Sequence, residues 1–463
     1  MKKHIHFIGI CGVAMSALAI AFHKKNYKVT GSDKGFFPPV STYLKNAGIK
    51  YYPGWHVDKM TKDGDPDLVI VGNVAGSNNP EWIYVQEKKL DYKSYPEAIA
   101  EFFVKENSIV CAGTYGKTTS TSLLAWILQE NNFDPSYMFG GISLNDMPAA
   151  KLTDSKYSIL EGDEYKSARW DDGAKFFHYS PTHLLLTSVV WDHADVYPTE
   201  QSYFQAFEKL LTNLPKSGLL VVSESVAKNI IVFAKCQTIT YGKNENNDYQ
   251  YQNVEVNKNG LKFEIKNENK IYQINSPLLG DYLADDMTAA FAMAKQIGLN
   301  TDKIIEALST YKNVKRRLEK KLDTDKDIVV IDDIAHSPQK ASSVLQTLKK
   351  IYNDGRIIAV FEPNTGNRQK AAIAGYDNKF IDADLVIIPK LTLIKQAPNE
   401  DPTIEGEELT EIIGKTQPNV IYIDDDKKLV DYIIKNTSQN DVVAFLGSHG
   451  FRNMIEAVVS RIS

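Results

Sequence analysis

The amino-acid sequence predicts an α/β protein with three domains, and three observations support this prediction. Two segments, residues 4–33 and 108–128, each combine an apolar strand, a glycine turn and a helical pattern. After Tyr311, five short apolar runs recur with helical stretches between them. Alternating strands and helices are typical of doubly wound parallel sheets. The length of 463 residues is also that of about three domains.

The first predicted domain, residues 1–105, opens with a Rossmann-type unit. We expect a strand at His4–Ile10, a helix at Ala14–Phe22 and a second strand at Lys28–Gly31. A further apolar strand at Leu68–Val71 extends the sheet. The pattern favours a Rossmann-like domain.

A glycine turn and two polar residues mark the candidate ligand site of this domain. Gly9 and Gly12 lie between the first strand and the first helix, and Ser32 and Asp33 follow the second strand. An acidic side chain about 20 residues past such a turn can accept hydrogen bonds from a ribose hydroxyl. Phe7 stands where the dinucleotide fingerprint has its first glycine, so we do not expect a dehydrogenase. Ordinary packing of a strand against a helix is the alternative.

The second predicted domain, residues 106–312, begins with a phosphate loop. The stretch SIVCAGTYGKTTST at 108–121 gives a β-branched strand, a tight loop and a helix N-terminus. Backbone N–H groups of such a loop bind an anion, its lysine reaches a phosphate, and its threonine hydroxyl holds Mg²⁺. Cys111 replaces the first glycine of the standard pattern, and a plain turn is the alternative. The residues expected to bind ATP are Gly113, Thr114, Gly116, Lys117, Thr118 and Thr119.

Two polar groups follow apolar strands of the same domain. Glu161, Gly162, Asp163 and Glu164 come after the strand at Tyr157–Leu160, and the segment 192–195 (Asp-His-Ala-Asp) comes after the strand at His183–Thr187. Ligands of parallel sheets bind at the carboxyl ends of strands. We expect clustered carboxylates to be neutralised by Mg²⁺, and His193 to be a metal ligand. Solvated loops are the alternative.

The Asn/Lys-rich segment 243–270 predicts an exposed β-meander.

The third predicted domain, residues 313–463, reads as a doubly wound, Rossmann-like sheet. Its apolar runs are Ile328–Ile331, Ile357–Phe361, Leu385–Ile388, Val420–Ile423 and Val442–Leu446. A polar group at 332–338 follows the first of these runs, and two arginines lie upstream. We expect the third domain to close over the nucleotide. One of the arginines would contact the phosphates, because its planar guanidinium matches phosphate oxygens, and an aspartate of the polar group would contact the ribose. The residues concerned are Arg316, Arg317, Asp332 and His336. A charged turn at a helix end is the alternative.

Composition excludes several classes of protein. The net charge of −5 and a pI near 6.0 without a basic stripe argue against nucleic-acid binding. The three cysteines, Cys11, Cys111 and Cys236, form no paired or metal-type pattern, which fits a reducing compartment. No apolar run reaches the roughly 18 residues of a membrane span. We therefore expect a cytoplasmic chain without membrane insertion.

Along nearly its whole length the chain resembles the Mur ligase family. The resemblance rests on GICGVAM at 9–15 with GSD at 31–33, AGTYGKTT at 112–119, EGDEY at 161–165, WDHADVY at 191–197, VKRRLE at 314–319 and DDIAHSP at 332–338. Within the family the chain is more similar to the murein peptide ligases than to the UDP-N-acetylmuramate–alanine ligases. FPPVSTYL at 37–44 and FFHYSPTHLLL at 176–186 suggest this.

The resemblance implies an ATP- and Mg²⁺-dependent bacterial ligase of cell-wall recycling. It would join UDP-N-acetylmuramate to the amine of the tripeptide L-Ala-γ-D-Glu-meso-diaminopimelate through an acyl phosphate. The N-terminal domain would hold the UDP-sugar, with Gly9 and Gly12 near the diphosphate and Ser32 and Asp33 near the uridine. Lys117, Glu161 and His193 would be catalytic, with Thr118, Glu161 and His193 as metal ligands. A monomer or weak homodimer is expected.

The chain departs from the family at the segment that contacts adenine. The family pattern Gly-x-His-Asn-x-x-Asn falls on Gly280, Tyr282, Leu283 and Asp286, so its three polar residues are replaced. Adenine recognition is therefore rearranged or ATP binds weakly. Tyr115 replaces a common histidine in the phosphate loop.

Three other functions stay open. The first is a ligase that adds free alanine to UDP-N-acetylmuramate in peptidoglycan synthesis. The second, suggested by the altered adenine segment, is a non-catalytic UDP-muramyl sensor. The third is a ligase like folylpolyglutamate synthase, against which the glycine turn and Asp33 of a full N-terminal domain argue.

Overall fold

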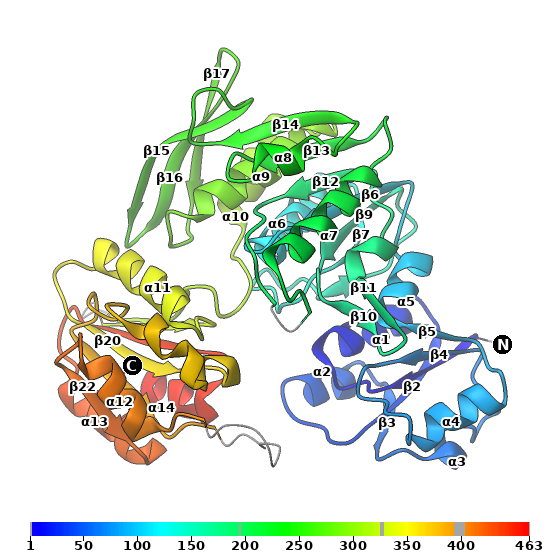
Figure 1. Cartoon of the computed structure of the whole chain (residues 1–463), viewed down its shortest axis with the longest axis horizontal. Helices are drawn as coiled ribbons and strands as arrows, with labels where there is room; N and C mark the ends of the chain where they lie inside the picture. The colour runs from blue at the N-terminus through cyan, green and yellow to red at the C-terminus, as the bar shows by residue number, and fades with distance from the viewer. Residues whose placement is uncertain (1, 194–195, 325–327, 393–402, 463) are drawn as a thin grey trace. The chain divides into compact units, whose positions relative to one another are not determined.

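The computed structural model describes residues 2–193, 196–324, 328–392 and 403–462. They form two compact units (Figure 1). The first unit comprises Met1–Val254, Lys262–Pro277 and Tyr282–Val314, and the second comprises Glu255–Leu261, Leu278–Asp281 and Lys315–Ser463. Three large sheets build the three-domain α/β fold that the sequence predicts.

The N-terminal sheet is parallel throughout, in the order β3-β2-β1-β4-β5. Its strands are β1 His4–Ile8, β2 Lys28–Asp33, β3 Lys50–Pro53, β4 Leu68–Val71 and β5 Tyr92–Ser94. Its helices are α1 Val13–Lys24, α2 Val40–Asn46, α3 Val57–Met60, α4 Pro80–Glu87 and α5 Tyr95–Phe102.

Local sequence explains where these elements begin and end. The first strand ends at Ile8 and not at Ile10 as predicted, because Gly9 takes a φ of +89° and starts the turn. Helix α4 begins where the Asn79 side chain accepts hydrogen bonds from the N–H groups of Glu81 and Trp82. Ser94 and Glu97 form a capping box at the start of α5.

The central sheet has ten strands in the order β17-β16-β15-β14-β13-β12-β6-β9-β7-β8. The strands are β6 Asn107–Ala112, β7 Ser136–Met138, β8 Ala150–Lys151, β9 Tyr157–Gly162, β12 His183–Leu186, β13 Leu219–Ser223, β14 Gln237–Gly242, β15 Tyr249–Asn257, β16 Gly260–Asn267 and β17 Lys270–Ser276. Strands β10 Lys166–Ala168 and β11 Asp171–Ala174 form a separate hairpin. The helices are α6 Lys117–Glu130, η1 Lys175–His178, α7 Glu200–Thr212, α8 Lys228–Ile231, α9 Leu283–Gln296 and α10 Thr301–Thr310.

Strand β6 lies inside this sheet, parallel to both of its neighbours, β9 and β12. Five of its six residues are buried, as expected for a strand with both faces covered. Its carboxyl end, with those of β9 and β12, is therefore where the sheet offers a ligand crevice. The β-meander predicted at 243–270 is confirmed as β15, β16 and β17.

The C-terminal sheet has the order β18-β19-β23-β20-β21-β22, with β18 antiparallel to β19. The strands are β18 Glu319–Asp323, β19 Val329–Asp333, β20 Ile357–Glu362, β21 Leu385–Pro389, β22 Val420–Ile423 and β23 Val442–Gly447. The helices are α11 Pro338–Ile351, η2 Thr365–Arg368, η3 Lys370–Tyr376, α12 Gly406–Gly414, α13 Asp426–Asn436, η4 Phe451–Asn453 and α14 Met454–Ile462.

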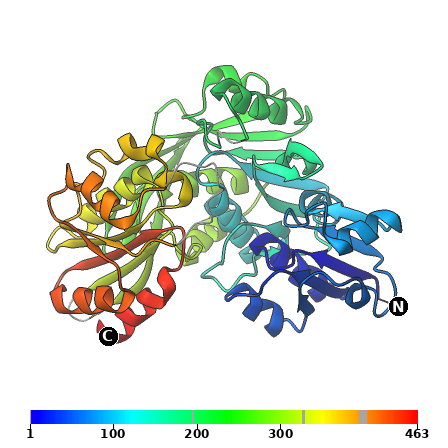
Figure 2. The same ribbon diagram turned by 60° about the horizontal axis from the view of Figure 1, so that its bottom comes forward.

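Two apolar cores lie on the two faces of this sheet. Val329 and Ile331 pack in a core with residues of α11 and α12, whereas Val330 packs in a core with residues of α13 and α14. Successive side chains of a strand point to opposite faces, so these helices cover opposite faces of the sheet. Figure 2 shows the red C-terminal helix on one side of the strands. The predicted doubly wound architecture is confirmed here. None of the described helices is long and apolar enough to cross a membrane.

Candidate active site

The phosphate loop joins β6 to α6 through two glycines with positive φ. Gly113 has a φ of +135°, and a Cβ there would lie 2.2 Å from the Thr187 hydroxyl oxygen. Gly116 is the N-cap of α6 with a φ of +79°, and a Cβ there would lie 2.4 Å from Asp286 Oδ1. Both positions therefore require glycine. The first N–H groups of α6 have no partner within the helix and are oriented to bind an anion.

Thr114 fixes this loop to the segment after β12. Its hydroxyl donates to the Val190 carbonyl oxygen at 2.8 Å and lies 2.9 Å from the Tyr203 hydroxyl. Its backbone N–H donates to the Ser188 carbonyl oxygen at 3.1 Å. The Thr114 side chain thus shapes the loop through internal bonds. Thr119, in the first turn of α6, is buried.

Lys117 lies between the loop and a buried carboxylate. Its Nζ donates to the Gly113 carbonyl oxygen at 2.7 Å and lies 3.0 and 2.9 Å from the two carboxylate oxygens of Glu164. The Lys117 side chain is 14% exposed and that of Glu164 only 1%. The lysine is therefore held at the loop by a partner that lies 47 residues away in the sequence.

Thr118 and Glu161 meet as the sequence predicts. The Thr118 hydroxyl donates to Glu161 Oε1 at 2.7 Å, and the Gly140 N–H donates to Glu161 Oε2 at 2.6 Å. Burial raises the pKa of Glu161, while these two hydrogen bonds and Lys117 oppose that rise. A hydroxyl and a carboxylate are hard oxygen ligands, which fit Mg²⁺ when phosphate oxygens and water complete its shell.

His193 lies against Glu164 and is not paired with Glu161. Its Nε2 is 3.5 Å from Glu164 Oε1, and the hydrogen bond with Glu164, aided by Asp192, raises the pKa of His193. Two members of the predicted group, Ala194 and Asp195, lie outside the described residues. Within the described ranges no three His, Cys, Asp or Glu side chains form a group that would hold a metal ion by themselves.

The glycine turn of the N-terminal domain is held by Asp33. The Asp33 carboxylate accepts hydrogen bonds from the Cys11 N–H at 2.8 Å and the Lys34 N–H at 2.7 Å. The Gly9 N–H donates to the Ser32 carbonyl oxygen at 2.8 Å, and Gly12 is the N-cap of α1. The structure therefore brings together all four residues predicted to bind the UDP-sugar.

Ser32 turns away from this turn toward Glu81, which sequence reasoning missed. The fully buried Ser32 hydroxyl donates to Glu81 Oε2 at 2.5 Å. The Tyr52 hydroxyl and the His56 N–H donate to Glu81 Oε1 at 2.7 and 2.8 Å. Burial works against the charge on Glu81, but His6 and the other donors hold its pKa below the usual value. The Ser32 side chain is thus part of a buried polar network. Ser32 lies near the end of β2, where a functional polar residue is expected, but Glu81 lies in α4 and no sequence pattern marks it as a partner.

In the second unit, Arg316 and Asp332 form an ion pair at 3.0 Å. The Arg316 guanidinium also donates to the carbonyl oxygens of Ser448 and Gly447, so its donors are used internally. Burial raises the pKa of Asp332, and Arg316 opposes that rise. Arg317 is half-buried and has no hydrogen bond or ion pair within the described parts of the chain. Arg317 is therefore the arginine whose guanidinium is available for a ligand.

His336 lies near the start of α11. Its Nδ1 is 2.7 Å from the Ile334 carbonyl oxygen, and burial lowers its pKa. A neutral imidazole with one nitrogen bound to the backbone is oriented by that bond.

The altered adenine segment lies directly against the phosphate loop. Leu283 is a core residue at 1% exposure, whereas Tyr282 is 45% exposed at the start of α9. Asp286 is buried beside Gly116, with its Oδ1 3.5 Å from the Ser120 hydroxyl. The segment thus lies beside the phosphate loop, although its side chains differ from those of the family pattern.

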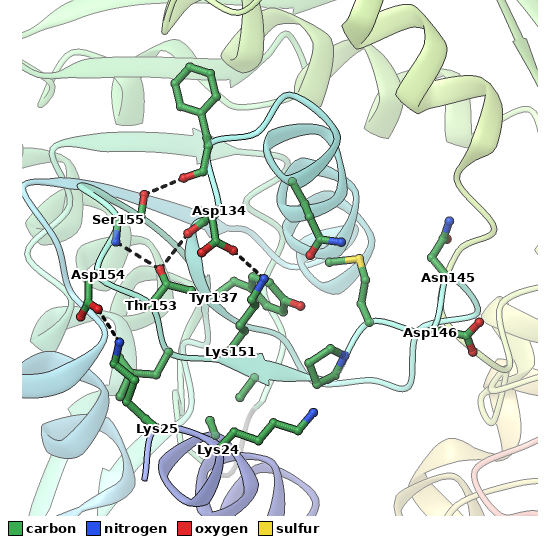
Figure 3. Close-up of a pocket in the computed structure, with 17 residues that line it drawn as sticks. Lys24, Lys25, Asp134, Tyr137, Asn145, Asp146, Lys151, Thr153, Asp154 and Ser155 are labelled. Atoms are coloured by element: carbon green, nitrogen blue, oxygen red, sulfur yellow. Dashed lines mark hydrogen bonds and ion pairs between the residues drawn. The ribbon is translucent and has the colours of Figure 1, made fainter.

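A separate hollow of about 680 Å³ lies between the end of α1 and strands β7 and β8 (Figure 3). Two of its three lysines are paired with neighbouring carboxylates, Lys25 with Asp154 at 2.6 Å and Lys151 with Asp134 at 2.5 Å. None of the predicted site residues lines it. It has no part in the arrangement around Lys117.

Comparisons with known proteins agree with this arrangement. Three family models match the chain: "Mur ligase family, catalytic domain" at residues 4–106, "Mur ligase middle domain" at 111–294 and "Mur ligase, glutamate ligase domain" at 316–449. A UDP-N-acetylmuramate–L-alanyl-γ-D-glutamyl-meso-2,6-diaminoheptandioate ligase of Haemophilus influenzae is 29% identical and covers 99% of both chains.

The other similar proteins include alanine ligases. A UDP-N-acetylmuramate–L-alanine ligase of Streptococcus mutans is 30% identical over 97% of this chain and 93% of its own. Among solved structures, the UDP-N-acetylmuramate–alanine ligase of Thermotoga maritima superposes with a TM-score of 0.80 at 22% identity, covering 100% of this chain and 99% of its own.

Family models that together span most of the chain, and a full-length relative at 30% identity, agree with the phosphate loop and the three sheets. The chain therefore belongs to the Mur ligase family, whose members are ATP-dependent ligases that form amide bonds.

Proposed function

We propose that this enzyme joins the carboxylate of UDP-N-acetylmuramate to the amine of the murein tripeptide L-Ala-γ-D-Glu-meso-diaminopimelate. The observation that supports the chemistry is the placement of Lys117, held between the Gly113 carbonyl and Glu164 at the carboxyl end of β6. The choice of substrates is supported by full-length relatives named for this reaction at 29% and 28% identity.

Each domain has its own task in this proposal. Residues 1–105 hold the UDP-sugar at the turn of Gly9 and Gly12, which Asp33 stabilises through its two backbone hydrogen bonds. Residues 106–312 bind ATP at the phosphate loop. Residues 313–463 supply Arg317 to the nucleotide and receive the amine, while Arg316, Asp332 and His336 shape that surface.

The chemistry needs ATP because a carboxylate has no good leaving group. An oxygen of the muramyl carboxylate attacks the γ-phosphorus, the bond to the bridging oxygen breaks, and ADP leaves with its electron pair. The amine nitrogen then attacks the acyl carbon, inorganic phosphate leaves, and the nitrogen loses a proton. Lys117 offsets the charge of the transferring phosphoryl group, and the N–H groups of α6 bind its oxygens.

The residues at the loop also fit a divalent cation. Thr118 and Glu161 would hold Mg²⁺, which supplies positive charge next to the phosphates when bound. His193 would be a further ligand only after leaving Glu164, because its Nε2 faces that carboxylate. As long as this contact persists, His193 acts through Glu164 on the position of Lys117.

The test is an acceptor comparison. The protein is incubated with ATP, Mg²⁺ and UDP-N-acetylmuramate, together with the tripeptide, with L-alanine or with neither, and ADP and the ligated product are measured. Product with the tripeptide and none with alanine supports the proposal. Product with alanine alone contradicts it.

The second candidate is a UDP-N-acetylmuramate–L-alanine ligase. Relatives with this name reach 30% identity, and the Thermotoga structure with this name has the TM-score of 0.80. Both candidates use the same loop chemistry, so only the acceptor separates them. A third, non-catalytic candidate is a UDP-muramyl sensor, suggested by Leu283 and Asp286 in the adenine segment. Tight UDP-sugar binding, with no ADP formed whichever acceptor is added, would favour the sensor.

A further inference from the structure

A small hairpin of the central domain reaches the N-terminal domain. Strands β10 and β11 pair antiparallel, with Lys166 opposite Ala174 and Ala168 opposite Asp171. The hairpin begins two residues after Glu164, the partner of Lys117, and its tip presents Arg169 and Trp170.

Aromatic contacts dock this tip on the N-terminal domain. The Trp170 ring stacks on Trp82 of α4 at a centroid distance of 5.4 Å and an interplanar angle of 20°. It also meets the Tyr92 ring edge-on at 5.6 Å. Such stacked and edge-on pairs stabilise a contact beyond the apolar area that they bury. The position of the neighbouring Arg169 is therefore defined by packing.

Arg169 lies at the rim of the glycine turn. Its Nε donates to the Asn73 carbonyl oxygen at 2.7 Å, and Asn73 follows the carboxyl end of β4. The preceding residue, Gly72, donates its N–H to the Ile8 carbonyl oxygen at 2.8 Å. A Cβ on Gly9 would lie 2.6 Å from the Val74 side chain. Residues 72–74 thus form one wall of the turn.

Most of the Arg169 guanidinium is available. Only its Nε has a hydrogen-bond partner within the described parts of the chain, and the side chain is exposed. A guanidinium has five N–H donors in a planar fork that matches phosphate oxygens in pairs. The Nη atoms therefore remain as donors for an anion at the turn.

We propose that Arg169 binds the diphosphate of the UDP-sugar substrate from the central domain. This inference rests on the proposed function, in which the turn of Gly9 and Gly12 holds that diphosphate. The hairpin would then connect substrate binding to the residue at its base, Glu164, which positions Lys117. The ligand site would be built from two domains of one compact unit.

Calorimetric titration without ATP tests this proposal, with UDP-N-acetylmuramate and with UDP as probes. Arg169→Ala should weaken both by roughly 10- to 100-fold, the range for hydrogen bonds to a charged group. Because the diphosphate is common to both probes, the two losses should be equal. The affinity of the wild type should also fall more steeply with added salt than that of the variant.

Lys166→Ala is the matched control. It removes one positive charge from the same hairpin, but the Lys166 ammonium is already paired with Asp172 at 2.7 Å. Its affinity for UDP should stay within about twofold of the wild type, since exposed pairs contribute little. Arg169→Met keeps the aliphatic stem and replaces Arg169→Ala if the thermal midpoint of the latter drops.

The outcomes separate this inference from the proposed function. If the wild type binds both probes and Arg169→Ala binds them equally well, the role of Arg169 is refuted while the UDP-sugar site stands. A loss for UDP-N-acetylmuramate with no loss for UDP would also refute it, because the contact would then lie on the sugar. If the wild type binds neither probe, the proposed function itself fails.

Discussion

At the residue scale, Glu164 connects the two cationic groups of the candidate active site. Its carboxylate lies 2.9 Å from Lys117 and 3.5 Å from His193, and it is 1% exposed. A buried carboxylate is costly unless its partners stay charged. Glu164 therefore fixes the position of Lys117 and raises the pKa of His193.

The pH dependence of stability tests the His193 contact. The folded-state pKa of His193 is raised from 6.5 by its hydrogen bond with Glu164. Its stabilising effect is therefore fully present below pH 6.5 and is lost as the pH rises through the folded-state pKa. We expect urea unfolding from pH 5.5 to pH 8.5 to show a stability deficit of His193→Gln at low pH that shrinks as the pH increases.

His183 provides a control of opposite sign. Burial lowers its pKa, so protonation destabilises the folded state and His183→Gln should relieve that loss at low pH. A His193→Gln deficit that is independent of pH would show that no charged pair with Glu164 exists.

Asp285 is predicted to destabilise the fold at neutral pH. Burial raises the pKa of this carboxyl from 3.8 to about 6, against the opposing hydrogen bond from Tyr251. Above pH 6 the folded protein must ionise a group that resists ionisation. Asp285→Asn should therefore raise the free energy of unfolding at pH 7.5 by about 1–3 kcal/mol and leave it nearly unchanged at pH 3.5. Chemical denaturation at both pH values would measure this, and an equal effect at both would contradict it.

At the element scale, the loop between β6 and α6 depends on the helix that packs beside it. Helix α9 places Asp286 so close to Gly116 that no side chain fits there. The loop between β6 and α6 is therefore shaped in part by α9, which packs against α6.

Gly116→Ala should be strongly destabilising for two separate reasons. The φ of +79° is unfavourable for alanine, and the new Cβ would lie 2.4 Å from Asp286 Oδ1. We expect a loss of about 1–3 kcal/mol from the backbone alone and a further loss from the contact. Denaturant unfolding of Gly116→Ala, Asp286→Ala and the double variant separates these terms, because the comparison with Asp286→Ala alone cancels the loss of its bond with Ser120.

Gly48→Ala is the matched control for the backbone term. Gly48 has a similar φ of +73° and no heavy atom within 4 Å of its Cβ position. A loss at Gly116 no larger than that at Gly48 would mean that Asp286 does not constrain the loop.

At the scale of the whole molecule, the residues proposed for substrate binding and those proposed for the chemistry lie on different sheets. Asp33 organises the turn of the N-terminal sheet, and Lys117 lies at the end of a central strand. Variants at the two positions should therefore affect different measured quantities.

Lys117→Ala should lower the rate of ADP release by about 100- to 1,000-fold, as loss of a charge-stabilising donor does. It should leave UDP-N-acetylmuramate binding nearly intact. Asp33→Ala should weaken that binding about tenfold, because the turn loses two hydrogen bonds to a carboxylate. Turnover at saturating substrate should persist in Asp33→Ala. Steady-state kinetics and calorimetry would measure both variants.

Lys117→Met combined with Glu164→Gln controls for the buried carboxylate that Lys117→Ala leaves without its cation. Equal loss of binding and turnover in either single variant would show that the two sites are not separate.

The sequence by itself determined the strands, the glycine turns and the phosphate loop. These features depend on local patterns: buried parallel strands are continuous apolar runs, and glycines occupy positions of positive φ such as Gly113 and Gly116. The same local patterns put Thr118 just after the phosphate loop and Glu161 at the end of an apolar strand, and the structure brings their oxygens to 2.7 Å.

The tertiary structure alone decided which polar groups pair. Glu161 and Glu164 are both glutamates of one four-residue segment, so the sequence does not distinguish them. In the structure Glu161 contacts Thr118, whereas Glu164 contacts Lys117 and His193. Ser32 binds Glu81, 49 residues away, although the glycine turn lies beside it. Likewise the guanidinium of Arg316 is used internally and that of Arg317 is not. Buried hydrogen bonds and ion pairs depend on contacts between distant segments, which residue spacing along the chain does not specify.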